Sequence, residues 1–295
     1  MHERARPPVR QRGFTLIELV VVILVAGILA STTALGVARL VDGYLRLQRR
    51  VVLSDNADLA LRRIARDVQA ALPMSLRVAS LGQVRYLELL ATKTGGRFVY
   101  QPACFTASGC QSLTTIGAVQ DGSWAFIAGS DRLSLWSQDY GTALNCAGGD
   151  VSAWCADTPG VVNWAPVITS FDSVGVAQQL RFANTAFSAV SDQAKNAFRV
   201  IEGPVTWVCD PVAGTLTRYW AYGLPRQTQW TGTPPADARS ALMAQQVSGC
   251  ELGYDSDASA ELGLQGRGLL SLALTLSAAT ESVSLMHQIH VNNVP

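Results

Sequence analysis

The sequence has little charge and almost no lysine. Only 15% of its 295 residues are charged, the formal net charge is +1, and Lys93 and Lys195 are the only lysines. Nucleic-acid binding depends on attraction between basic side chains and phosphate, so a chain without a basic field is a poor candidate for it. The absence of an acidic run likewise argues against a disordered acidic tail. We therefore expect no nucleic-acid partner.

The motifs of several enzyme classes are also absent. The sequence has no G-x-S-x-G, no H-E-x-x-H and no phosphate-binding loop. The only H-x-x-H is formed by His287 and His290 in a strand-like segment, where residues three apart face opposite sides and cannot readily hold one ion. We expect no catalytic centre and no cofactor, and we interpret the chain as a non-enzymatic protein.

One acidic segment has the spacing with which a calcium loop begins. Asp255 and Asp257 are followed at the same alternating spacing by Ser259 and Glu261. However, alanine stands where such a loop needs glycine, and glycine stands where it needs its final glutamate. A polar loop is the simpler interpretation. Asp255 and Asp257 are thus a weak calcium candidate, and we predict no metal centre.

Cysteine is missing from the N-terminal third of the chain. All six cysteines lie after residue 100, and their even number and late placement predict disulfides formed in an oxidising compartment. None of the spacings is the C-x2-C of a structural zinc site. Six cysteines allow many pairings, but neighbours in loops favour three local pairs: Cys104 with Cys110, Cys146 with Cys155, and Cys209 with Cys250.

The N-terminus combines a basic leader with a long apolar run. In residues 1–13 the arginines outnumber the single acid Glu3, and in residues 14–38 the only charged side chain is Glu18. As a helix this run would extend about 37 Å, enough to cross a hydrocarbon core of about 30 Å. Basic residues favour the cytoplasmic side of a membrane and disulfides form outside the cytoplasm. Both signals predict a cytoplasmic leader and a cysteine-bearing bulk in the periplasm.

Glu18 requires an explanation, because a charge within a membrane costs roughly 2.5–3.5 kcal/mol. A secretory signal peptide should end in a small-x-small cleavage site and should not carry a carboxylate near its start. A permanent anchor of a periplasmic enzyme or receptor explains the length of the run but gives Glu18 no partner. Cleavage after Gly13 would make Phe14 the first residue and place its α-ammonium one helical turn from Glu18. The two charges would then offset each other's desolvation.

The segment "RGFTLIELVVVILVAGILA", residues 12–30, resembles the class III leader and first helix of type IV pilins and type II secretion pseudopilins. In that family, prepilin peptidase cuts after the glycine and methylates the new N-terminus, which implies a processing site between Gly13 and Phe14. The family uses the glutamate at the fifth mature position to neutralise the N-terminus of an adjacent subunit, and the resemblance assigns this assembly role to Glu18. It also implies three kinds of partner: other major and minor pilins, prepilin peptidase and the inner-membrane assembly platform.

Beyond the apolar run the helical pattern continues and then gives way to strands. Apolar residues at spacings of three and four predict one helix over residues 14–72, amphipathic over 39–72 and stopped by Pro73. Residues 73–295 contain short strand-like runs separated by turn residues, which predict a β-rich globular domain. We expect hairpins around "KTGG", "AGSDR" and "DPVAG", loops over 101–123, 138–166 and 223–240, and a terminal strand pair over 269–277 and 282–294.

A long helix against an antiparallel sheet with disulfide-bearing loops is an α+β arrangement that agrees with the type IV pilin fold. The chain left after cleavage would be longer than a typical major pilin, which favours a minor subunit. Three segments resemble the large minor pilin of mannose-sensitive haemagglutinin (MSHA) pili, the MshO type: "LSDNADLALRRIARDVQAALP", "FRVIEGPVTWVCDPVAGTLTRYW" and "VSLMHQIHVNNVP". The resemblance implies a protein that crosses the inner membrane once and then enters a filament. A minor pseudopilin of type II secretion and a membrane-anchored periplasmic enzyme or receptor remain as alternatives.

Overall fold

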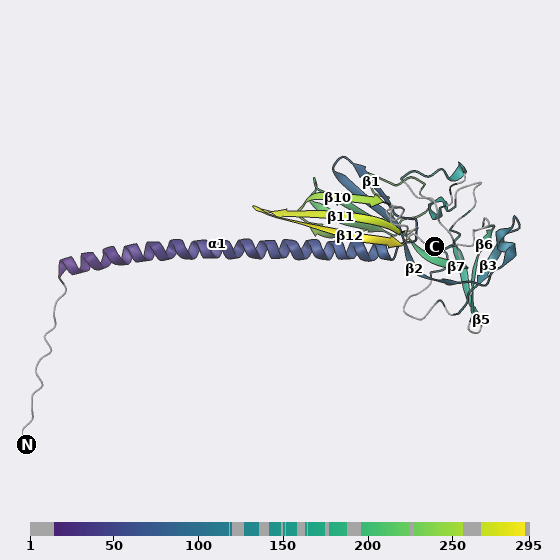
Figure 1. Ribbon diagram of the computed structural model, residues 1–295, viewed down its shortest axis with the longest axis horizontal. Coiled ribbons are helices and arrows are strands. Elements are labelled where there is room, and N and C mark those ends of the chain that lie inside the picture. Colours follow the sequence, from purple (N-terminus) through teal and green to yellow (C-terminus); the bar gives the residue numbers. More distant parts are fainter. Residues whose placement is uncertain are drawn as a thin grey trace, which may run out of the picture. The chain divides into compact units, whose positions relative to one another are not determined.

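The computed structural model describes residues 15–117, 119, 127–135, 142–148, 150, 152–157, 163, 165–174, 177–187, 196–224, 227–255 and 267–292. The chain divides into two compact units, residues 1–51 and residues 52–295. Figure 1 traces the single long helix α1 and the strands that follow it.

The helix α1 spans Leu16–Gln69 and contributes to both units. Within the second unit, its buried residues recur every three or four positions, as expected for one helix face packed on a core. They are Leu53, Ala57, Ala60, Leu61, Ile64, Ala65 and Val68. The arginines Arg62, Arg63 and Arg66 lie between these positions and are exposed. This periodicity determines which side of residues 52–69 faces the sheets.

The described part of the second unit contains three antiparallel sheets. The large sheet has the order β1-β2-β7-β8-β9, with β4 also paired with β7. Its strands are β1 (Arg77–Leu81), β2 (Val84–Arg97), β4 (Arg132–Ser134), β7 (Ala197–Asp210), β8 (Thr215–Trp220) and β9 (Arg239–Gln245). The C-terminal sheet has the order β10-β11-β12, with strands β10 (Val247–Asp255), β11 (Arg267–Ala278) and β12 (Glu281–Asn292).

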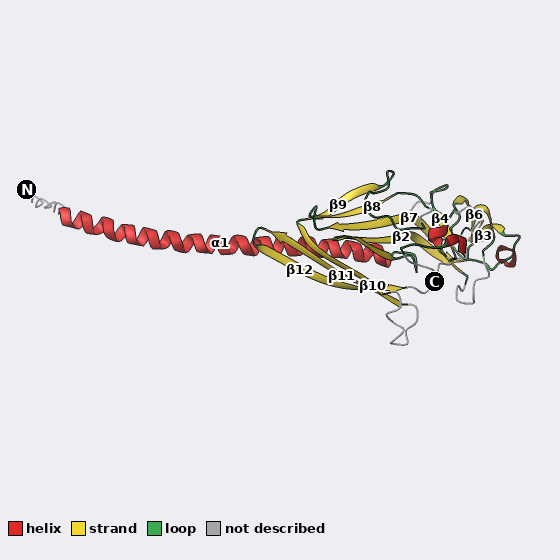
Figure 2. Cartoon of the chain, turned by 90° about the horizontal axis from the view of Figure 1, so that it is seen from above, coloured by secondary structure: helices red, strands yellow, loops and turns green. Residues whose placement is uncertain are grey.

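Residues 52–69 of α1 lie between the large sheet and the C-terminal sheet (Figure 2). The core that they share includes Leu87 and Trp207 of the large sheet and Leu272 and Leu274 of the C-terminal sheet, each at most 3% exposed. The helix thus buries apolar side chains against two sheets at once.

A polar contact fixes the last turns of the same helix. Asp67 Oδ2 accepts hydrogen bonds from Trp207 Nε1 at 2.9 Å and from Arg218 Nε at 2.7 Å. Trp207 lies on β7 and Arg218 on β8. One carboxylate oxygen of α1 therefore holds two neighbouring strands of the large sheet.

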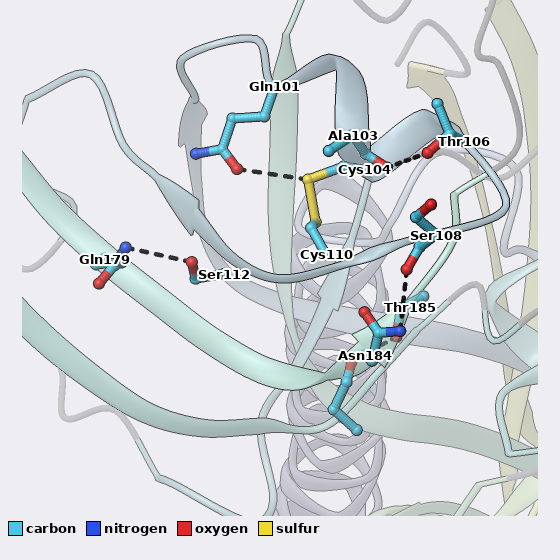
Figure 3. Close-up of a disulfide and its surroundings, with 11 residues drawn as sticks. Gln101, Ala103, Cys104, Thr106, Ser108, Cys110, Ser112, Gln179, Asn184 and Thr185 are labelled. Carbon is cyan, nitrogen blue, oxygen red and sulfur yellow. Dashed lines mark hydrogen bonds between the residues drawn. A yellow bond between two sulfur atoms is a disulfide. The ribbon is translucent and has the colours of Figure 1, made fainter.

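The small sheet, order β3-β6-β5, consists of β3 (Cys110–Thr114), β5 (Ile168–Val174) and β6 (Ala177–Thr185). It packs on a separate core that it shares with β4 and β7 of the large sheet, and this core includes Phe98, Phe182 and Phe198. Figure 3 shows how the segment before β3 is held. The disulfide Cys104–Cys110 closes it, and Asn184 Nδ2 on β6 donates to the carbonyl oxygen of Ser108 at 3.1 Å.

The disulfides are the three pairs that the sequence favoured. Besides Cys104–Cys110, the structure has Cys146–Cys155 and Cys209–Cys250. The Cys146–Cys155 pair links the short 3-10 helices Cys146–Gly148 and Ala153–Cys155. The Cys209–Cys250 pair links β7 to β10 and so joins the large sheet to the C-terminal sheet.

Several sequence-based expectations agree with these elements. The helix α1, Leu16–Gln69, begins and ends within three residues of the expected limits, residues 14 and 72. The "DPVAG" hairpin is formed by β7 and β8, which pair from Asp210↔Thr215 onward, and the terminal strand pair is β11 with β12. The apolar helix followed by antiparallel sheets and disulfides is consistent with an α+β pilin-like fold.

The hairpin expected at "KTGG" is wrong. Residues 93–96 continue the strand β2, and Gly95 and Gly96 pair with Arg199 and Phe198 on β7. Register shifts between Ala91 and Thr94 adjust the pairing just before the glycines. A side chain at Gly95 would have its Cβ only 2.7 Å from Arg199 Cδ, so the glycine serves close strand approach rather than a turn.

Other expectations need correction or fall partly outside the described residues. The expected loop 101–123 contains β3, and the strands β1, β5, β6, β9 and β10 were not anticipated. The second arm of the "AGSDR" hairpin, β4, pairs with β7. The sequence predicts residues 124–127 as the first arm of this hairpin and residues 133–137 as its second, and residues 124–126 lie outside the described residues.

Candidate processing and assembly site

The first turn of α1 is held by Thr15 and Glu18. Thr15 precedes the helix, and its Oγ1 and its carbonyl oxygen accept the backbone N–H of Glu18 at 3.3 and 3.1 Å. A threonine followed three residues later by glutamate is the capping-box pattern, in which the hydroxyl satisfies a backbone donor that the helix start leaves unpaired. Thr15 was not among the predicted site residues, although the T-x-x-E spacing could have identified it.

Glu18 is the acidic residue of this first turn, and its side chain is exposed. A carboxylate at a helix N-terminus interacts favourably with the helix dipole, typically by about 0.3–1 kcal/mol. The expected processing residues Gly13 and Phe14 lie outside the described residues.

The apolar segment that follows could cross a membrane by length and composition. Residues Leu16–Thr33 have a mean hydropathy of 2.4, and none of them is buried within the chain. Eighteen helical residues extend about 27 Å, close to the thickness of a hydrocarbon core. A signal sequence near an N-terminus has the same properties, so hydropathy alone does not decide between an anchor and a leader.

Hydroxyl groups near the end of this segment are satisfied within the helix. Ser31 Oγ donates to the carbonyl oxygen of Ile28 at 2.9 Å, and Thr33 Oγ1 donates to that of Leu29 at 2.8 Å. Thr32 Oγ1 lies 3.0 Å from the carbonyl oxygen of Leu29. Because each hydroxyl has a backbone partner, these residues add little polar cost to an apolar environment. Glu18 is left as the only charged side chain between Thr15 and Thr33.

A family model of the prokaryotic N-terminal methylation motif matches residues 9–34. The match includes Gly13, Phe14 and Glu18 and covers the apolar segment. No curated protein and no solved structure matched the chain. The motif supports the type IV pilin and pseudopilin superfamily. It indicates a prepilin-like protein that prepilin peptidase processes and that assembles with other pilins, and the apolar helix is consistent with membrane anchoring.

A second polar cluster lies inside the globular unit, around Glu88. The side chains of Arg77 and Glu88 are fully buried, and Arg77 Nε and Nη2 both lie 2.7 Å from Glu88 Oε2. Glu88 Oε1 accepts hydrogen bonds from Tyr222 Oη at 2.7 Å and from Thr206 Oγ1 at 3.3 Å. The guanidinium carbon of Arg77 lies 3.8 Å from the ring centroid of Trp154.

The Glu88 cluster connects distant segments of the chain. Arg77 and Glu88 belong to β1 and β2, whereas Trp154 belongs to the disulfide-closed segment and Tyr222 follows β8. Burial and the neighbouring carboxylate raise the pKa of Tyr222, so its hydroxyl remains a hydrogen-bond donor at neutral pH. These residues were not predicted from the sequence, because nothing in their local spacing marks them as partners. Their mutual pairing gives the cluster a structural role.

The metal candidates do not come together in the described chain. Asp255 is the last residue of β10, and Asp257 lies outside the described residues. His287 and His290 are exposed on β12. The described residues contain no group of three or more histidine, cysteine, aspartate or glutamate side chains that could hold a metal ion.

Proposed function

We propose that the chain is a non-enzymatic minor pilin that takes part in the biogenesis of a type IV pilus of the MSHA type. The observation that carries the proposal is the N-terminal methylation motif over residues 9–34. The subfamily rests on the resemblance of three later segments to the large minor pilin of MSHA pili. In this proposal the leader, residues 1–13, is cytoplasmic, the apolar segment crosses the inner membrane, and the disulfide-bearing unit lies in the periplasm until the subunit enters a filament.

Processing would change the charge balance of the first helical turn. Cleavage after Gly13 creates an α-ammonium at Phe14, one residue before the cap Thr15. Isolated in lipid, the Glu18 carboxylate and this ammonium would each carry a desolvation cost of several kcal/mol. Pairing Glu18 with the ammonium of an adjacent subunit removes both unpaired charges. The pair thus stabilises the subunit when its helix lies beside the helix of a processed neighbour.

Replacing Glu18 tests this role directly. Glu18→Ala removes a charge from the apolar segment, so we expect membrane insertion and processing to remain normal. Incorporation into filaments should fall by about tenfold or more, because the neighbour's ammonium is left without its partner. The matched control is Asp42→Ala, which removes an exposed acid of the same helix outside the apolar segment. Normal incorporation of Glu18→Ala would contradict the assembly role.

Gly13→Val tests the processing site separately. A larger side chain at the scissile bond should block cleavage, so the protein should retain its leader and fail to assemble. N-terminal sequencing that still begins at Phe14 would refute this assignment.

A minor pseudopilin of a type II secretion system would carry the same methylation motif. Deletion of the gene separates the two functions, because a pilus subunit is needed for surface filaments and a pseudopilin for protein export. A membrane-anchored enzyme or receptor predicts neither phenotype and predicts an uncleaved N-terminus.

A further inference from the structure

The strand β12 has one edge to which no described strand is paired. The C-terminal sheet has the order β10-β11-β12, so β12 is bonded on one side only. Its pairing with β11 runs without a bulge from Arg267↔Asn292 to Ala278↔Glu281. A regular edge strand presents a row of backbone donors and acceptors that can bind another extended chain.

The usual protection of such an edge is missing from β12. Proteins blunt sheet edges with short strands, proline, bulges or charged side chains, lysine in particular. The sequence of β12, ESVSLMHQIHVN, has twelve residues, no proline, no lysine and no arginine, and its only acid, Glu281, is at its first position. The outer strands of the large sheet differ: β1 has five residues, and β9 has seven residues and a register shift against β8.

The core beneath the C-terminal sheet is incompletely covered at β12. On β11, Leu274 and Leu276 are at most 3% exposed. Their partners across the strand pair, Leu285 and Val283 on β12, are only half-buried. On the other face of β12, Met286 is 67% exposed. An added strand would shield these apolar side chains as well as the backbone groups of the edge.

We infer that β12 is a docking strand for an extended segment of a neighbouring filament subunit, which adds to the C-terminal sheet by backbone hydrogen bonding. This inference rests on the proposed function. Because β12 has no lysine or arginine, and its inner face is apolar apart from His287, the segment it fits is uncharged, with apolar residues at alternate positions. Two copies of β12 paired antiparallel would run their helices, residues 52–69, in opposite directions. Chains inserted in one membrane by the same end share a direction, so this antiparallel pair of two β12 strands is excluded.

A photo-crosslinking residue at Met286 tests the edge. The full chain is expressed in the native cells during filament assembly, and crosslinked products are identified by mass spectrometry. The matched control carries the same residue at Ala273, which is the partner of Met286 on the central strand β11. Strand addition places a neighbour beside β12 but not beside β11, so the yield at Met286 should exceed that at Ala273 at least about fivefold. The product should contain a second chain with a processed pilin N-terminus.

A lysine that points toward the core provides a second test. Leu285 faces the core and pairs with Leu274, whereas Gln288 pairs with Ser271 on the outer face. An inward charge on an edge strand opposes strand addition. Leu285→Lys should therefore lower the Met286 crosslink by about tenfold, and Gln288→Lys should change it by less than about twofold. Unchanged thermal unfolding and normal processing of Leu285→Lys show that the fold is kept.

Four outcomes of the crosslinking overturn the inference: equal yields at Met286 and Ala273, a crosslink within the same chain, a product with an unrelated protein, or no product. If the chain is processed and depends on Glu18 for incorporation while any of these occurs, only the β12 inference fails. If the N-terminus is unprocessed, the proposed function fails and the inference fails with it.

Discussion

Replacing Arg77 by methionine should strongly destabilise the globular unit. The Arg77 and Glu88 side chains are both 0% exposed and are joined by two contacts of 2.7 Å. Removing one member of a buried ion pair leaves the other charge without compensation, which costs about 3–5 kcal/mol. Methionine keeps much of the side-chain volume and can still contact the Trp154 ring, so most of the loss should come from the uncompensated charge of the buried Glu88.

The double variant Arg77→Met/Glu88→Gln isolates the electrostatic part. Glutamine keeps an oxygen that can accept from Tyr222 and Thr206, but it carries no charge to be left unpaired. We expect it to recover at least half of the stability lost in Arg77→Met, since an uncharged pair avoids the desolvation penalty.

The assay is urea unfolding of the full oxidised chain in detergent micelles, followed by tryptophan fluorescence. The free energies of unfolding of the wild type, both single variants and the double variant complete a double-mutant cycle. Arg77→Met should lose about 3–5 kcal/mol, a large share of the 5–15 kcal/mol typical of a domain. A loss below about 1 kcal/mol, or a double variant as unstable as the sum of the two singles, would refute the argument.

Three further predictions concern the globular unit. The Cys209→Ser/Cys250→Ser variant should lose about 4 kcal/mol in the same assay, because that disulfide closes a sequence separation of 41 residues; a loss below about 1 kcal/mol would contradict it. Gly95→Ala should lower the free energy of unfolding by about 1–3 kcal/mol, because the new Cβ would lie 2.7 Å from Arg199 Cδ. An unchanged unfolding midpoint would contradict this prediction and show that β7 can shift to accept the methyl group. The pKa of Tyr222 is raised in the folded state, so its contribution to the free energy of unfolding is complete below the unfolded pKa of about 10 and is lost as the pH rises above that value. Tyr222→Phe should therefore reduce the fall of the free energy of unfolding with pH above about 10, and equal slopes for the wild type and the variant would contradict the prediction.

Features set by neighbouring residues could be predicted from the sequence. The helix α1 follows from a continuous apolar run in its first half and from apolar residues at spacings of three and four in its second half. The β7–β8 hairpin follows from two strand-like runs on either side of turn residues. Two of the three disulfides, Cys104–Cys110 and Cys146–Cys155, could likewise be predicted because their cysteines lie close together in the sequence. The position of Glu18 near the start of α1 was also predicted, because the apolar run that forms the helix begins only a few residues before it.

Features that depend on distant partners were missed. Gly95 resembles a turn residue locally, and only pairing with Arg199, far along the chain, makes it part of a strand. Arg77 and Glu88 look like solvent-facing positions, yet loops elsewhere in the sequence cover them. The strand β10 contains glycines, which are uncommon in strands, so its tendency to pair with β11 comes from tertiary packing rather than from propensity.

The mass of the mature N-terminal peptide tests the central claim most directly. The full chain would be isolated from native membranes or filaments and its first peptide identified by mass spectrometry. A prepilin-like protein predicts a chain that begins at Phe14 and carries a methyl group on its amino terminus. A chain that retains Met1, or one cut farther along by a signal peptidase, would contradict the account.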